Sequence, residues 1–91
     1  MSSRKRLHVL YSGRVQGVGF RYTAKTVATG FEVTGIVRNL ADGRVEVHAQ
    51  ASARALDDFE GRLRIGPPRS EVRTVEVREE SVAALDSFRI R

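Results

Sequence analysis

A nine-residue stretch containing three glycines, Gly13–Arg21, separates two segments of different hydrophobic periodicity. In the segment before it, apolar residues alternate with a period of two, as in a strand: Leu7, Val9 and Tyr11. In the segment after it, apolar residues recur along one helical stripe: Ala24, Val27, Ala28 and Phe31. A glycine-rich loop between a strand and a helix start binds phosphate well, because backbone N–H groups converge there and the helix N-terminus is partly positive. The pattern therefore predicts an anion site in this loop.

Arg21 stands at the start of the predicted helix, where its planar guanidinium can contact two phosphate oxygens at once. The loop is neither of the common nucleotide-binding loops. No Gly-Lys-Ser/Thr follows, and the glycine spacing does not fit the dinucleotide fingerprint. We therefore predict a phosphate site made by consecutive residues of the loop: Val15, Gln16, Gly17, Val18, Gly19, Phe20 and Arg21.

The stretch reads Gly-Arg-Val-Gln-Gly-Val-Gly-Phe-Arg and resembles, almost letter for letter, the signature of the acylphosphatases. A second block of this family is similar to residues 35–46, and the resemblance extends from about Leu7 to Ile90. It implies an enzyme that hydrolyses the carboxyl-phosphate bond of acyl phosphates to a carboxylate and inorganic phosphate. It also implies that Arg21 and the 15–21 loop hold the phosphate, while Asn39 orients the attacking water.

The residues suit this reaction. The leaving carboxylate has a conjugate acid of pKa about 4, so it departs as an anion without a general acid. The phosphoryl transition state is loose, and loop amides with one guanidinium can stabilise its charge. The sequence has no Asp/His cluster at metal-ligand spacing, so we expect a metal-independent enzyme without a cofactor. Ile36 and Ala51 depart from residues common in the family, at positions expected to affect packing and turn geometry only.

The whole chain predicts the order βαββαβ followed by a last strand. The expected strands cover residues 4–12, 31–39, 44–50, 72–79 and 88–90, and the expected helices residues 21–29 and about 53–65. This is an α+β sandwich of ferredoxin-like type, with an antiparallel sheet and two helices on one face. The resemblance to acylphosphatases implies the same architecture.

Several positions carry more specific expectations. Gly30 is expected to end the first helix in a left-handed conformation, and Ser52 to cap the second. Val77, with Val75, is expected to be buried in the fourth strand. His8 and His48 fall on the face opposite the core valines, and we interpret both as surface positions.

Length and charge bound the remaining possibilities. The 91 residues predict one domain, with residues 1–6 as a polar N-terminal extension. No apolar run is long enough to span a bilayer, and the basic start lacks the apolar region of a secretion signal, so a cytoplasmic protein is expected. The net charge of +5 is spread along the chain, which favours small anions, with inorganic phosphate or sulfate as competitors. We expect a monomer.

Three alternatives remain open at this point. An RNA-recognition motif has the same element order, but it stacks bases on strand aromatics, and residues 44–49 contain none, so nucleic-acid binding is disfavoured. A phosphate-binding domain without turnover, like the acylphosphatase-like domain of carbamoyl-transfer maturation proteins, would share the loop. A metabolite-binding regulatory domain is compatible with the fold. The physiological acyl phosphate is not encoded in a recognisable pattern.

Overall fold

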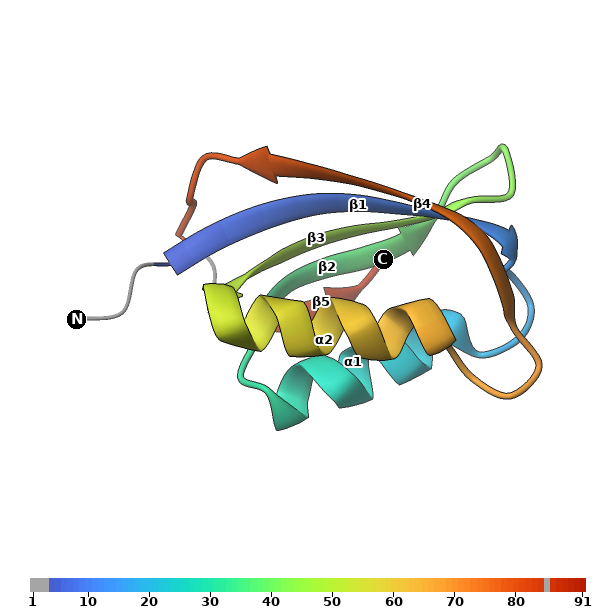
Figure 1. The fold of residues 1–91 in the computed structure, drawn as a ribbon, viewed down its shortest axis with the longest axis horizontal. Helices are drawn as coiled ribbons and strands as arrows, with labels where there is room; N and C mark the ends of the chain where they lie inside the picture. The colour runs from blue at the N-terminus through green and yellow to red at the C-terminus, as the bar shows by residue number, and fades with distance from the viewer. Residues whose placement is uncertain (1–3, 85) are drawn as a thin grey trace.

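The computed structural model describes residues 4–84 and 86–91. Its elements follow in the order β1 (Arg4–Arg14), α1 (Phe20–Gly30), β2 (Thr34–Asn39), β3 (Val45–Ser52), α2 (Ala53–Ile65), β4 (Glu71–Glu80) and β5 (Phe88–Ile90). The strands form one sheet in the order β4-β1-β3-β2-β5, and both helices pack on one face of it (Figure 1). The predicted ferredoxin-like sandwich is confirmed. The sheet is mixed rather than wholly antiparallel, because β5 pairs parallel to β2.

Strand β1 is longer than the sequence pattern suggested at its C-terminal end. A bulge between Ser12 and Gly13 lets the strand continue along β4 to Arg14. A side chain at Gly13 would place its Cβ 2.2 Å from the carbonyl oxygen of Glu71, so only glycine allows this approach. At the other end β1 begins at Arg4. This start agrees with the strand predicted from residue 4, so residues 4–6 of the expected polar extension belong to the sheet, and residues 1–3 lie outside the described residues.

The core lies between the helices and the sheet. The alternating positions predicted to face inward are buried in all three central strands: Val9 and Tyr11, Val37, and Val45, Val47 and Ala49. The helical stripes cover them, with Phe20, Ala24 and Ala28 from α1 and Leu56, Phe59 and Leu63 from α2. Each large apolar side chain buried in this way contributes about 1.5–3 kcal/mol. Phe20, the first residue of α1, packs against Tyr11 with ring centroids 5.2 Å apart, which couples the helix start to β1.

The C-terminal end of α1 differs from the prediction. Gly30 is still helical, and the left-handed residue is Glu32, with φ of 56°. The amide of Val33 donates to the carbonyl of Ala28 at 2.8 Å, and the amide of Glu32 donates to Thr29 at 3.4 Å. This is the Schellman arrangement with a glutamate in the place where glycine is usual. Burial of Val33 against the core outweighs the cost of that conformation.

Helix α2 begins and ends as predicted. The hydroxyl of Ser52 accepts a hydrogen bond from the amide of Ala55 at 3.2 Å, and Gly66, with φ of 69°, follows the last turn. With 13 residues it is the longer helix, and no helix in residues 4–84 or 86–91 combines the length and apolar character that a membrane crossing needs.

Gly61 offers a test of how α2 is stabilised. It lies in the helix interior, and a Cβ there would contact nothing within 4 Å. We expect Gly61→Ala to raise the free energy of unfolding by about 1 kcal/mol, which corresponds to about 4–8 °C in the midpoint of thermal unfolding for a domain of this size. The matched control is Gly66→Ala, which should destabilise because its φ is positive and its Cβ would lie 2.2 Å from the Ser70 hydroxyl. Calorimetry of both variants measures the difference, and a destabilised Gly61→Ala would contradict the expectation.

The sheet edge and the outer face of the sheet also depart from the pattern. Val77 was expected to be buried, but it is 44% exposed, because β4 is an edge strand that the helices do not cover there. On the face away from the helices, Glu46 and Gln50 are buried. The Gln50 carboxamide exchanges two hydrogen bonds with the backbone of Ala83, which fastens the connection between β4 and β5 across the end of the sheet.

Candidate active site

The loop after β1 is held at both ends by buried side chains. Val15 is 1% exposed and Phe20 is 2% exposed, and both belong to the core cluster. Between them, Gly17 and Gly19 are exposed. The two apolar anchors fix the ends of the loop, so the backbone between them is presented to solvent in a defined place.

The backbone of the loop alternates in handedness. Gly17 and Gly19 have φ of 73° and 81°, whereas the residues between and beside them do not have positive φ. Alternation of this kind turns successive N–H groups toward one side and forms a concave nest for an anion. A residue with a Cβ adopts the left-handed conformation at a cost of roughly 1–2 kcal/mol. The glycines are therefore required by the shape of the loop, although a Cβ at either position would meet nothing within 4 Å.

The N-terminus of α1 adds to the positive potential of the loop. Its N-cap is Gly19, which supplies no side-chain acceptor, and the first turn contains no acidic residue. The amides of the first turn and the positive end of the helix dipole are therefore left for a ligand. Arg21 lies in this turn, and its Nη1 donates a hydrogen bond of 3.3 Å to the backbone carbonyl of Arg91, next to β5. This contact directs the guanidinium along the last strand.

Asn39 approaches the loop from another element. It is the last residue of β2, and it pairs in register with Val45 of β3, so the hairpin fixes its backbone. Within the described residues, its carboxamide makes no hydrogen bond, which leaves both its donor and its acceptor available. Asn39 lies on the same strand face as the buried Val37. Its side chain therefore starts on the face where the helices and the loop lie.

Loop, guanidinium and carboxamide line one open cavity of about 230 Å³, whose walls are Val15, Gly17, Gly19, Phe20, Arg21, Tyr22, Asn39 and Ile90. Of these described residues Arg21 alone is charged, and none is acidic. Most of the predicted site residues are thus brought together. Gln16 and Val18 do not line the cavity, and Val18 is instead partly buried against the core. Tyr22 and Ile90 were not predicted as wall residues. The position of Tyr22 directly after Arg21 could have suggested it, whereas nothing in the sequence places Ile90 beside the loop.

The side chain of Gln16 has a role that the sequence did not reveal. Its Nε2 donates to the carbonyl of Leu40 at 2.8 Å and to the carbonyl of Arg44 at 3.0 Å. These two carbonyls belong to the ends of the β2–β3 hairpin, which also carries Asn39. Gln16 therefore ties the phosphate loop to the hairpin and sets the distance between them.

Loss of this tie should affect the site more than the fold. We expect Gln16→Met, which keeps the length of the side chain and removes both donors, to lower turnover of an acyl phosphate by between about 10-fold and 100-fold. The loss of stability should be smaller, about 0.5–1.5 kcal/mol, because the carbonyls of Leu40 and Arg44 each keep a hydrogen bond from a backbone amide. Steady-state kinetics and inhibition by inorganic phosphate measure the effect on the site. Unchanged kcat and KM alongside a lowered unfolding midpoint would show that Gln16 serves the fold alone.

Comparison with known proteins gives concordant matches. The family model described as Acylphosphatase matches residues 7–90. The chain is 48% identical over 79 residues to an acylphosphatase of Solibacter usitatus, covering 87% of this chain and 82% of that protein. It is 42% identical to an acylphosphatase of Archaeoglobus fulgidus, covering 92% and 94% of the two chains. The crystal structure of an acylphosphatase from Bacillus subtilis superposes with a TM-score of 0.93 at 36% identity, over 96% of this chain and 98% of that one.

Proposed function

The chain belongs to the acylphosphatase family and hydrolyses acyl phosphates to a carboxylate and inorganic phosphate, and we propose that the cavity between the Val15–Arg21 loop and Asn39 is where it does so. One observation supports this location above the others. An exposed nest of amides, one guanidinium and one carboxamide that makes no hydrogen bond within residues 4–84 and 86–91 converge on the same cavity, from the loop, α1 and β2.

In this proposal, the phosphoryl group of the substrate lies against the amides of residues 15–21. The alternating backbone of the loop and the uncapped start of α1 offer N–H donors, and Arg21 offers a forked pair of donors. These groups are fixed before the substrate arrives, because Val15 and Phe20 are buried and Gln16 is hydrogen-bonded to the hairpin. Donors that need no rearrangement stabilise the charge that develops on the equatorial oxygens of the transition state.

Water attacks the phosphorus while the bond to the carboxylate oxygen breaks. The carboxylate leaves as an anion at neutral pH, which explains why a cavity without an acidic wall residue is sufficient. Asn39 can both accept a hydrogen bond from the attacking water and donate one to it, and we assign it the orientation of that water. The proton of the water passes to an oxygen of the phosphoryl group, because none of the described wall residues carries a carboxylate or an imidazole that could accept it.

Hydrolysis of benzoyl phosphate by the purified protein, with substrate loss followed spectroscopically, tests the reaction. Inorganic phosphate should inhibit competitively, since it contains the same tetrahedral group, and sulfate should do so more weakly. Occupation of the cavity by phosphate or sulfate in a soaked crystal tests the location. If the protein hydrolysed benzoyl phosphate but the soaked anion bound outside the cavity, the activity would stand and the assignment of the site would be overturned.

Catalysis in this proposal requires neither a metal nor a cofactor, because every charge-stabilising group belongs to the chain. We expect the rate of benzoyl phosphate hydrolysis to be unchanged after incubation with excess EDTA and after dialysis against metal-free buffer. Addition of Mg²⁺ should not raise it. An EDTA-sensitive rate that divalent ions restore would contradict the mechanism.

The wider setting follows from the same reasoning. We propose that the chain acts as a single domain and as a monomer on small acyl phosphates in the cytoplasm. We expect no nucleic-acid binding, because β3, Val45–Ser52, contains no Phe, Tyr or Trp on which a base could stack, and its His48 ring is already stacked on His8. Gel filtration at several protein concentrations and a salt-titrated RNA-binding measurement test these two statements.

A further inference from the structure

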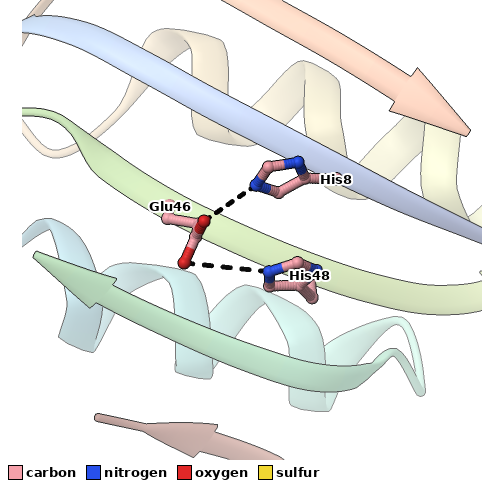
Figure 2. Close-up of side chains that lie close together, drawn as sticks. All are labelled: His8, Glu46 and His48. Atoms are coloured by element: carbon pink, nitrogen blue, oxygen red, sulfur yellow. Dashed lines mark hydrogen bonds and ion pairs between the residues drawn. The ribbon is translucent and has the colours of Figure 1, made fainter. Parts of the chain in front are cut away.

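Two histidines lie side by side on the sheet face opposite the helices. His8 of β1 and His48 of β3 are directly paired across the two strands, and their rings are stacked with centroids 4.4 Å apart and planes 8° from parallel. They lie on the outer face of the sheet, as the sequence predicted, but they are not freely solvated, because their side chains are only 19% and 17% exposed. Figure 2 shows both rings with a nitrogen toward the carboxylate of Glu46.

The carboxylate of Glu46 bridges the same edge of the two rings. Its Oε2 lies 2.9 Å from Nε2 of His8, and its Oε1 lies 3.7 Å from Nε2 of His48. Glu46 is two residues before His48 on β3, so both side chains emerge on one face of one strand. Backbone pairing of β1 with β3 fixes the positions from which all three side chains start.

A second carboxylate orients the rings from their opposite edge. Oε2 of Glu80 accepts a hydrogen bond of 2.9 Å from Nδ1 of His48, and Oε1 of Glu80 lies 4.0 Å from Nδ1 of His8. Glu80 is itself held by Nε of Arg6 at 3.0 Å. A proton on Nδ1 of His48 leaves the lone pair on its Nε2 directed toward Glu46. A carboxylate behind a histidine is the usual second partner of a metal-binding imidazole.

We propose that Nε2 of His8, Nε2 of His48 and a carboxylate oxygen of Glu46 form a binding site for a divalent transition-metal ion, with Zn²⁺ as the representative. Their ligand atoms lie within 4.8 Å of one another. Two ligands about 2.0–2.1 Å from a tetrahedral ion are separated by about 3.3 Å. The two separations that involve Glu46, 2.9 and 3.7 Å, bracket that value, and no pair of ligand atoms exceeds 4.8 Å. The stacked rings must tilt toward each other so that both Nε2 lone pairs reach one ion.

The donor set selects the class of ion. Two imidazoles and one carboxylate suit Zn²⁺, Co²⁺, Ni²⁺ or Cu²⁺, whereas Mg²⁺ and Ca²⁺ prefer sites made of oxygen. Nε2 of His8 hydrogen-bonds to Glu46, so His8 must carry its proton on Nδ1, which faces Glu80, when an ion binds. Arg38 is half exposed and can turn into solvent when an ion takes its place beside Glu46. Three protein ligands leave one tetrahedral position for water.

The site is separate from the proposed catalytic cavity, because it lies on the other face of the sheet and shares no residue with the cavity wall. An ion there would link β1 to β3 and stabilise the folded state by mass action. It would not contact the substrate. The proposal of a Zn²⁺ site and the proposal of the catalytic cavity can therefore be tested, and overturned, separately.

The experiment is a calorimetric titration of untagged protein with Zn²⁺ in phosphate-free buffer, repeated with Mg²⁺. We expect one equivalent of Zn²⁺ to bind saturably and to raise the midpoint of thermal unfolding, and Mg²⁺ to do neither. Co²⁺ should give the visible absorption of a tetrahedral site. No saturable Zn²⁺ binding by the folded wild-type protein would overturn the proposal.

Variants distinguish a metal site from a purely structural hydrogen-bond network. His8→Ala, His48→Ala and Glu46→Gln should each abolish saturable binding, and Glu80→Gln should weaken it by about 10–100-fold. Arg38→Met should tighten it by roughly tenfold, because a competing positive charge is removed. The matched control is Glu79→Gln. It removes one negative charge next to Glu80 in the sequence, but on the opposite face of the strand, so this variant should bind Zn²⁺ as the wild type does. Should a His→Ala variant fail to fold, His8→Asn and His48→Asn replace it, and undiminished Zn²⁺ binding in folded histidine variants overturns the proposal.

Discussion

Replacement of Arg21 by alanine should abolish measurable hydrolysis of acyl phosphates, with a loss of at least about 10³-fold in kcat/KM. Arg21 is the one charged wall residue among those described in the cavity, and it lies in the first turn of α1 beside the loop amides. Its contribution grows as negative charge spreads over the phosphoryl oxygens. Removal of the guanidinium should therefore reduce the stabilisation of the transition state more than the affinity for inorganic phosphate.

Arg21→Lys should rescue little of this loss. A lysine retains the charge, but it cannot place two parallel N–H donors on two oxygens, and it cannot keep the contact that fixes the guanidinium against the carbonyl of Arg91. The matched control is Arg54→Ala, an exposed arginine on α2 that does not line the cavity. The measurement is kcat/KM for benzoyl phosphate with the unfolding midpoint of each variant. Near-normal rates in either Arg21 variant would remove this residue from the mechanism.

The main lines of the fold are encoded locally, and this is why the sequence predicts them. The alternation of Val45, Val47 and Ala49 and the stripe of α2 each point one face inward, and both are observed. Burial on the outer face is not encoded in this way. Glu46 is buried there by contacts with side chains from other strands, which no periodicity reports.

The end of α1 shows the same limit at the level of the backbone. Glycine is the better residue for a left-handed position, so Gly30 was the natural choice from sequence. The left-handed residue lies two positions later, at Glu32, because the hydrogen bond from the amide of Val33 to the carbonyl of Ala28 and the burial of Val33 fix the path of the chain after the helix. Local propensity favours Gly30 over Glu32 for the left-handed conformation, but tertiary packing places that conformation at Glu32.

In the candidate site, most of the residues that the sequence motif predicted line one cavity, and pairing in the sheet accounts for how they meet. Arg21 and Asn39 are separated by a helix and a strand, and the register of β2 on β3 places Asn39 beside the loop. The side chain of Gln16 could not be placed from the motif, since its partners are backbone carbonyls of a hairpin remote in sequence. The pairing of His8 with His48 likewise depends on strand register, which alternation alone does not determine.

Asn39→Ala should separate binding from turnover. The loop and Arg21 remain, so inorganic phosphate should inhibit the residual activity nearly as strongly as in the wild type. The group to which we assign the orientation of the water is lost, so kcat should fall by about 10²–10³-fold, the range seen when one preorganised polar group is removed. The free carboxamide of Asn39, without a hydrogen bond in residues 4–84 and 86–91, makes this separation possible, because its removal leaves no buried partner unsatisfied.

Asn39→Asp provides the complementary variant. It keeps the shape of the side chain but brings a negative charge to a cavity that binds an anion, so it should weaken phosphate inhibition as well as turnover. The measurements are kcat, the inhibition constant for phosphate and the unfolding midpoint for both variants. If Asn39→Ala weakened phosphate binding and turnover in equal proportion, Asn39 would act by holding the hairpin in place, and the water would have to be oriented by the loop. If Asn39→Ala kept phosphate inhibition but lost turnover, the missing group would act on the water and not on the phosphate. The position of Asn39 in the wall of the cavity, beside the loop, supports this role.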